Sequence, residues 1–110
     1  MDALEARSRL LARRAELDEE DRISAEARAP VALDQDSVGR LSRMDAMQVQ
    51  SMALAAERRR QAERARIETA LQRIADEEWG WCVTCGEEIA PGRLDHDPSV
   101  AQCLACASGG

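Results

Sequence analysis

The chain has 110 residues and a net charge of −6, because 21 acidic residues outnumber 15 basic ones, all of them arginine. Two tryptophans are its only aromatic residues and much of its apolar content is alanine, so we do not expect a compact globular core. No apolar run approaches 18 residues, and the start of the chain mixes charges throughout. These features predict a cytoplasmic protein with neither a membrane span nor a secretory signal.

Two long helices are predicted before the first cysteine. Residues 2–29 are rich in Ala, Leu, Glu and Arg and contain no Gly or Pro, so they predict a helix. Pro30 disfavours helix at the preceding residue and marks a break at 30–36. Asp36 or Ser37 can cap a second helix, which we place at 37–78. Its 42 residues would extend roughly 63 Å, too long for a small globule, so this helix needs a partner.

Apolar residues predict that the first helix is that partner. An imperfect stripe on each helix favours an antiparallel hairpin with a coiled-coil-like seam, folded at the break. The two stripes are Leu4, Leu10, Leu11, Leu17 and Ile23, and Val38, Leu41, Val49, Met52 and Ala56. The register predicted from this fold pairs Ile23 with Leu41, Leu17 with Val49, and Leu11 with Leu54.

The later part of the second helix has a different composition. Alanine is the only apolar residue type in 57–66, so we expect its pairing to be thin and frayed. Ile67, Leu71 and Ile74 restore an apolar stripe, which we assign to packing against the C-terminal module. Arginines interleaved with glutamates predict a solvated face with salt bridges or, alternatively, a docking patch for an acidic partner. These arginines are Arg58, Arg59, Arg60, Arg64 and Arg66.

Four cysteines carry the strongest chemical signal in the sequence. Two C-x2-C pairs are separated by 17 residues, which matches the pattern of a four-cysteine zinc site. The ligands would be Cys82, Cys85, Cys103 and Cys106. Gly86 follows the first pair, where a crowded backbone favours glycine. Pro91-Gly92 predicts a turn in a short hairpin that returns the chain to the second pair.

The cysteines could also serve other roles. Two disulfides would suit a secreted chain, and a redox dithiol would need a βαβ pattern that is absent. His96 could replace one cysteine ligand, but four suitably spaced cysteines favour a loop role for it. Nothing indicates catalytic zinc, so we predict one closed, structural Zn²⁺. Residues 79–110 carry a charge of −3, which argues against direct DNA binding by the finger.

The break between the helices is acidic. Asp34 and Asp36 would lie at the far end of a rod, where they could simply cap a helix and complement its dipole. Alternatively, a long rod could deliver these carboxylates into a deep cavity. Three methionines near this end, Met44, Met47 and Met52, could be seam or contact residues.

The run DEEWGWCVTCGEEIAPGRLDHDPSVAQCLAC after a helical hairpin resembles the DksA/TraR family of four-cysteine zinc-finger proteins. The resemblance covers residues from about Asp34 to Cys106. It implies a protein that binds bacterial RNA polymerase rather than DNA, with a coiled coil that enters the secondary channel. It also implies altered transcription initiation, often together with ppGpp, the alarmone of the stringent response.

The tip departs from the pattern of the long family members. Asp36 matches the first of their two tip aspartates, but Gly39 stands where the second would be. Leu41 replaces a small alanine. A weaker, different or competing regulatory effect is therefore open. We take Asp34, Asp36 and Arg40 as the candidate partner-binding residues of the tip.

We therefore predict a mainly α-helical protein: a long antiparallel helical hairpin followed by a small zinc finger. The hairpin occupies 1–78 with its tip at about 30–37, the finger 79–107, and a flexible tail 108–110. Trp79 and Trp81 are expected to anchor the joint between Ile74 and the finger. The predicted function is regulation of RNA polymerase by a monomer without enzymatic activity. An adaptor that binds another helical protein, or a thiol-based redox protein, is the alternative.

Overall fold

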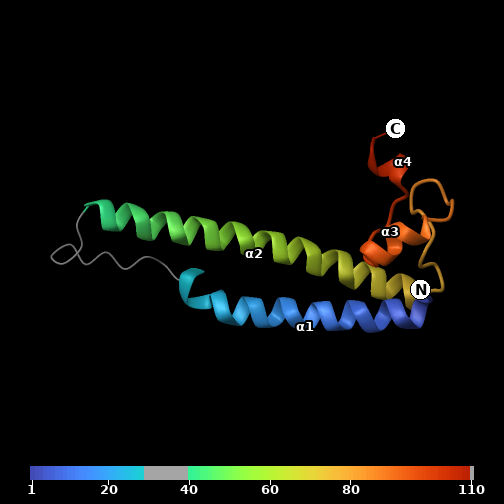
Figure 1. The fold of residues 1–110 in the computed structure, drawn as a ribbon, viewed down its shortest axis with the longest axis horizontal. Helices are drawn as coiled ribbons and strands as arrows, with labels where there is room; N and C mark the ends of the chain where they lie inside the picture. Colours follow the sequence, from blue (N-terminus) through green and yellow to red (C-terminus); the bar gives the residue numbers. More distant parts are fainter. Residues whose placement is uncertain (29–39, 110) are drawn as a thin grey trace.

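The computed structural model describes residues 1–28 and 40–109 and shows a two-helix stem with a small module at one end (Figure 1). Its helices are α1 (Ala3–Arg28), α2 (Arg40–Ala75), α3 (Pro91–His96) and α4 (Leu104–Ala107). α1 and α2 run antiparallel, and the molecule measures 61 × 31 × 20 Å along its principal axes. The predicted mainly helical fold is confirmed. No helix in the described ranges has the length and apolar character needed to cross a membrane.

Local contacts explain where the stem helices begin and end. Asp2 caps α1, because its carboxylate accepts a hydrogen bond of 2.8 Å from the backbone N–H of Glu5. α2 ends in a paired-hydrogen-bond motif around Glu77, whose φ of 60° lies in the left-handed region. In that motif the N–H of Glu78 donates a hydrogen bond to the carbonyl of Arg73, and the N–H of Glu77 donates one to the carbonyl of Ile74. α2 therefore stops three residues before the predicted end at 78.

The apolar core of the stem lies at the end nearest the finger. Leu10, Leu17, Ile67 and Ala70 form one buried cluster, and Leu71 and Ile74 pack against it. Three of these side chains are almost completely buried: Leu10 is 2% exposed, Leu17 0% and Ile67 1%. α1 therefore reaches Ile67, and the expectation that this stripe lies beyond the first helix and packs against the C-terminal module is wrong for Ile67.

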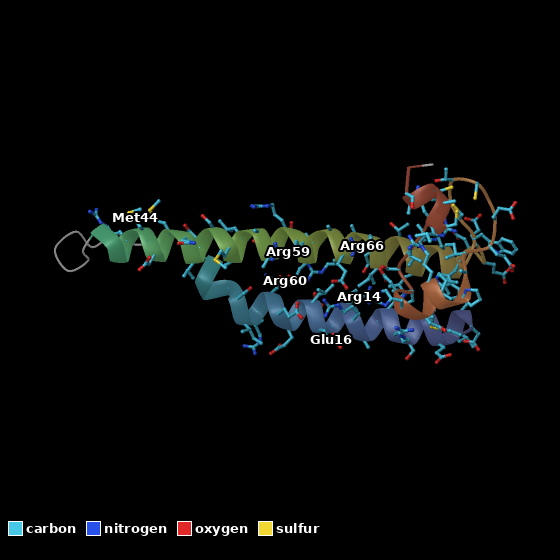
Figure 2. The ribbon with its side chains drawn as sticks, turned by 45° about the horizontal axis from the view of Figure 1, so that its top comes forward. Arg14, Glu16, Met44, Arg59, Arg60 and Arg66 are labelled. Carbon is cyan, nitrogen blue, oxygen red and sulfur yellow. The ribbon has the colours of Figure 1, made fainter. Side chains whose placement is uncertain are left out.

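The predicted register of the hairpin is also wrong. Leu17 packs with Ile67 rather than with Val49, and both Ile23 and Val49 are exposed, at 67% and 57%. The predicted register folds the chain at the break so that the end of the first helix pairs with the start of the second. α2 has 36 residues and α1 has 26, so this alignment pairs the wrong residues. In the structure the start of α2, near Met44, extends past the end of α1 (Figures 1 and 2).

Residues 57–66 are paired with α1 rather than frayed. Arg60 and Arg64 of this segment form ion pairs with Asp21 of α1 at 2.6 and 2.7 Å. The salt bridges predicted for the arginine run are present at these two residues, but they cross the seam instead of lying on a solvated face, since the Arg60 and Arg64 side chains are only 12% and 27% exposed. The reason is that alanine leaves room for long charged side chains to meet across the seam.

A second, smaller core holds the C-terminal module together. Cys82, Ile89 and Leu94 are buried, and Trp79 and Val100 pack against them. The only β pairing among residues 1–28 and 40–109 is an isolated antiparallel bridge between Trp81 and Glu88. The module therefore has little regular secondary structure and only a small apolar core to hold its fold.

Candidate metal centre

The first cysteine pair lies in a tight backbone turn. The N–H of Gly86 donates to the carbonyl of Cys82 at 3.0 Å, and the N–H of Cys82 donates to the carbonyl of Glu87 at 2.8 Å. Gly86 has a φ of 76°, as expected for a position that only glycine occupies without strain. The turn also directs the N–H of Thr84 toward the Cys82 sulfur at 3.4 Å. It thus places the Cys82 and Cys85 sulfurs on one side of the backbone.

The second pair is held by the start of a helix. Cys103 is the residue before α4, and Cys106 lies within that helix. Two contacts join this turn to the first: the N–H of Val83 donates to the carbonyl of Ala101, and the Gln102 amide donates to the Thr84 hydroxyl, both at 2.9 Å. The two cysteine pairs therefore face each other across a short, hydrogen-bonded interface.

The four sulfurs have the separation that a single zinc ion requires. The sulfur atoms of Cys82, Cys85, Cys103 and Cys106 all lie within 4.8 Å of one another. Zn–S bonds of about 2.3 Å in a tetrahedron place two sulfurs about 3.8 Å apart. Cys85 and Cys103 are 3.7 Å apart, whereas a disulfide would bring the sulfurs to about 2.05 Å. The chain therefore has a four-cysteine site that binds one Zn²⁺.

Crowding of the sulfurs changes how they titrate. Backbone N–H groups of Cys103 and Cys85 stabilise the Cys82 thiolate and lower the pKa of Cys82 to about 5. Hydrogen bonds to the neighbouring sulfurs, first that of Cys103, raise the pKa of Cys106 to about 12. One thiol thus ionises easily while another holds its proton. A divalent cation favours ionisation of all four, because its charge offsets the repulsion between thiolates.

The 17 residues between the pairs do not form the predicted hairpin. Pro91-Gly92 begins helix α3 instead of a turn, because proline is well tolerated at the first position of a helix. α3 ends at His96, which is exposed and lies against a hollow on the side of the stem rather than in the sulfur cluster. In the described ranges, the four cysteines are the only group of metal-ligating side chains that gather in this way.

The two tryptophans occupy different positions at the joint. Trp79 packs against the finger core, and its indole N–H donates to the carbonyl of Pro98 at 2.9 Å. Trp81 is 47% exposed, and its backbone rather than its ring takes part in the bridge to Glu88. Trp79 is therefore placed to connect the end of α2 with the loop after α3, whereas the Trp81 ring is not buried in the joint.

Two arginines that the sequence analysis did not single out make structural contacts here: Arg73 fastens the joint between α2 and the finger, and Arg93 connects parts of the finger to each other. Arg73 donates to the carbonyl of Glu78 at 2.8 Å and also to that of Trp81, while Nε of Arg93 donates to the carbonyl of Gln102 at 2.9 Å. Both line a hollow of about 600 Å³ in the corner between α2 and the finger. The position of Arg73 in the last turn of a helix was the available signal, because cations there meet unpaired carbonyl groups.

The tip predictions fall largely outside the described residues. Asp34 and Asp36 lie in the range 29–39, and Arg40 is the first residue of α2, with no description of its side chain. The three methionines near this end are exposed, at 56% for Met44, 52% for Met47 and 64% for Met52. None of the three is a buried seam residue.

Comparison with known proteins supports the zinc site and the fold separately. The family described as "Prokaryotic dksA/traR C4-type zinc finger" matches residues 78–109. Two curated relatives, both named "RNA polymerase-binding transcription factor DksA", come from Escherichia coli K12 and Salmonella typhimurium. Each is 39% identical over 41 residues, which cover 37% of this chain and 27% of the relative. The match thus spans about a quarter of the length of these relatives.

The fold likeness extends over nearly the whole chain. The solved structure of transcription factor DksA2 from Pseudomonas aeruginosa matches with a TM-score of 0.74. The match covers 97% of this chain and 81% of that protein, at 22% sequence identity. The stem and finger are therefore arranged as they are in that protein.

Proposed function

We propose that this chain acts as a member of the DksA/TraR family of four-cysteine zinc-finger proteins, binding bacterial RNA polymerase and regulating transcription initiation. The observation that carries the proposal is the combination of a zinc-finger match with a fold that 97% of this chain shares with a transcription factor. The curated relatives are themselves named for polymerase binding.

In the proposed mechanism the chain acts by insertion and contact, without chemistry of its own. The stem enters the secondary channel of the polymerase with the start of α2 leading, and the finger remains at the channel entrance. The structure supports this with a narrow rod, 61 Å by 20 Å in its longest and shortest dimensions. A net charge of −6 weakens competition for DNA, because phosphates repel an acidic surface.

The proposed contact residues are at the tip. Asp34, Asp36 and Arg40 would approach the catalytic centre and alter the lifetime of promoter complexes. ppGpp would act on the complex rather than on the isolated chain. We further propose that the chain works as a monomer in the cytoplasm and does not contact DNA directly.

In vitro transcription tests the proposal. Purified polymerase on an rRNA-type promoter should give altered initiation when the zinc-bound protein is added, both with and without ppGpp as separate arms. Asp36→Asn should reduce the effect, whereas Asp76→Asn, a matched change just after α2 and far from the tip, should not. An unchanged transcript yield at saturating wild-type protein would contradict the regulatory role.

The adaptor hypothesis remains the second candidate, because Met44, Met47 and Met52 are exposed on one helix. Methionine-rich surfaces adapt well to apolar partners. A native-salt pull-down separates the two proposals. Recovery of polymerase subunits supports the regulator, whereas recovery of another helical protein without polymerase supports the adaptor.

A further inference from the structure

The seam between α1 and α2 changes character along its length. From Ala6 to Leu17 the side chains of α1 that face α2 include three buried apolar residues. Beyond Leu17, no side chain in the described range 18–25 is buried, and Ile23 is 67% exposed. The half of the seam nearest the finger, called here the apolar half, is thus followed by a half without an apolar core.

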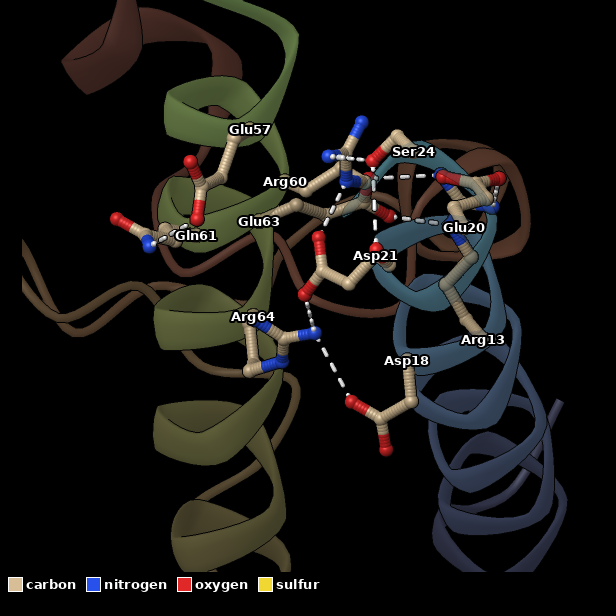
Figure 3. A network of polar contacts seen from close by, with 10 residues as sticks. All are labelled: Arg13, Asp18, Glu20, Asp21, Ser24, Glu57, Arg60, Gln61, Glu63 and Arg64. Atoms are coloured by element: carbon tan, nitrogen blue, oxygen red, sulfur yellow. Dashed lines mark hydrogen bonds and ion pairs between the residues drawn. The ribbon is translucent and has the colours of Figure 1, made fainter. Parts of the chain in front are cut away.

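Charged side chains take the place of that core. Asp21 of α1 accepts hydrogen bonds from two arginines of α2, one on each carboxylate oxygen: Arg60 at 2.6 Å and Arg64 at 2.7 Å (Figure 3). Arg60 also donates to the Ser24 hydroxyl, and Arg64 to Asp18, both at 2.9 Å. We call Asp18, Asp21, Ser24, Arg60 and Arg64 the ionic clasp. In Figure 3 its members point toward one another across the gap between the two helices.

The clasp is close enough to solvent to feel dissolved salt. The side chains of Asp21 and Arg64 are 24% and 27% exposed, that of Asp18 is 67% exposed, and only Arg60 is largely covered, at 12%. Ions screen such charges strongly, because the Debye length falls from about 10 Å at 0.1 M to about 3 Å at 1 M salt. The other half also has two ion pairs across the seam, Arg13 with Glu63 and Arg14 with Glu68, but its burial of apolar surface does not depend on this screening.

We propose that the ionic clasp is an ionic-strength-sensitive latch that lets the end of α1, from Asp18 to Arg28, separate from α2 while the apolar half stays closed. Local opening of this kind is expected where a segment has few buried apolar contacts and solvent-accessible polar ones. The latch lies on the side of the apolar half that faces away from the finger (Figure 1). Its opening would therefore change the width of the stem without disturbing the zinc site.

Hydrogen exchange of the zinc-bound full chain tests the latch directly. Amides of α1 at 18–28 should exchange about tenfold faster at about 1 M than at about 0.05 M sodium chloride. Amides at 6–17 serve as the internal control and should change less than twofold. Equal changes in both ranges, or none in either, would overturn the proposal, because the stem would then open as one unit or not at all.

Two matched variants identify the groups responsible. Asp21→Asn keeps the size of the side chain but removes the charge that holds Arg60 and Arg64. In this variant the amides at 18–28 should exchange at low salt as fast as those of the wild type do at high salt. Glu19→Gln removes a neighbouring carboxylate that pairs with Arg22 of the same helix, and it should behave as wild type. A salt response that survives in Asp21→Asn, or disappears in Glu19→Gln, would show that the ionic clasp does not cause the response. The response is a property of the isolated chain, so it stands or falls independently of polymerase binding.

Discussion

Replacement of Leu17 by alanine should lower the free energy of unfolding by about 3 kcal/mol. Leu17 is 0% exposed and packs with Leu10 and Ile67. The change removes three buried carbon groups, worth about 2.4 kcal/mol of transfer free energy at 0.8 kcal/mol each. The cavity that remains after incomplete collapse around the missing side chain adds a fraction of a kcal/mol.

Urea unfolding followed by far-ultraviolet circular dichroism measures this loss in the zinc-bound protein. Ile23→Ala is the matched control, since the apolar pattern places Ile23 in the seam but the structure leaves it 67% exposed. It should change the free energy of unfolding by less than about 0.5 kcal/mol. Similar losses in both variants, or a larger loss for Ile23, would refute the register of the stem and the reasoning built on it.

Three further predictions concern the finger and the clasp. Cys103→Ser should abolish stoichiometric zinc binding, measured by metal analysis, and expose residues 79–107 to rapid hydrogen exchange, because the finger has little core without metal. Gly86→Ala should weaken zinc affinity about fivefold in a chelator competition, since φ of 76° costs a side-chain residue about 1 kcal/mol. Hydrogen bonds from Arg60 and Arg64 hold the pKa of Asp21 below its usual value. The ionised carboxylate therefore stabilises the fold above about pH 4, and this stabilisation is lost as the pH falls through the lower pKa of the folded state. The stability difference between wild type and Asp21→Asn should therefore shrink between pH 6 and pH 3; a constant difference would contradict this assignment.

Local patterns in the sequence predict more of this molecule than long-range ones. The spacing of Cys82, Cys85, Cys103 and Cys106 predicts the sulfur cluster, because each pair closes over two intervening residues. The helix ends near residues 3 and 28 follow equally from composition and from the break at Pro30. Each of these features depends on neighbours within a few positions.

The register of the stem depends on residues far apart in the chain, which is why its prediction failed. Asp21 meets Arg60 across 39 positions and Arg13 meets Glu63 across 50. Alanine-rich stripes allow several alignments of similar apolar content, so ion pairs across the seam help to select one. Pro91-Gly92 misled for a different reason: proline followed by glycine is compatible with both a turn and the first turn of a helix.

The unbroken length of α2 has a mechanical consequence. Its 36 residues extend about 54 Å from the start of the helix to the joint that Arg73 and Trp79 fasten. A tilt of about 5° at that joint would swing the opposite end by about 5 Å over this lever arm. Small changes in the packing of the Trp79 indole and the Arg73 guanidinium would therefore change the orientation of the whole of α2. The orientation of this helix is thus determined at its base rather than at its far end.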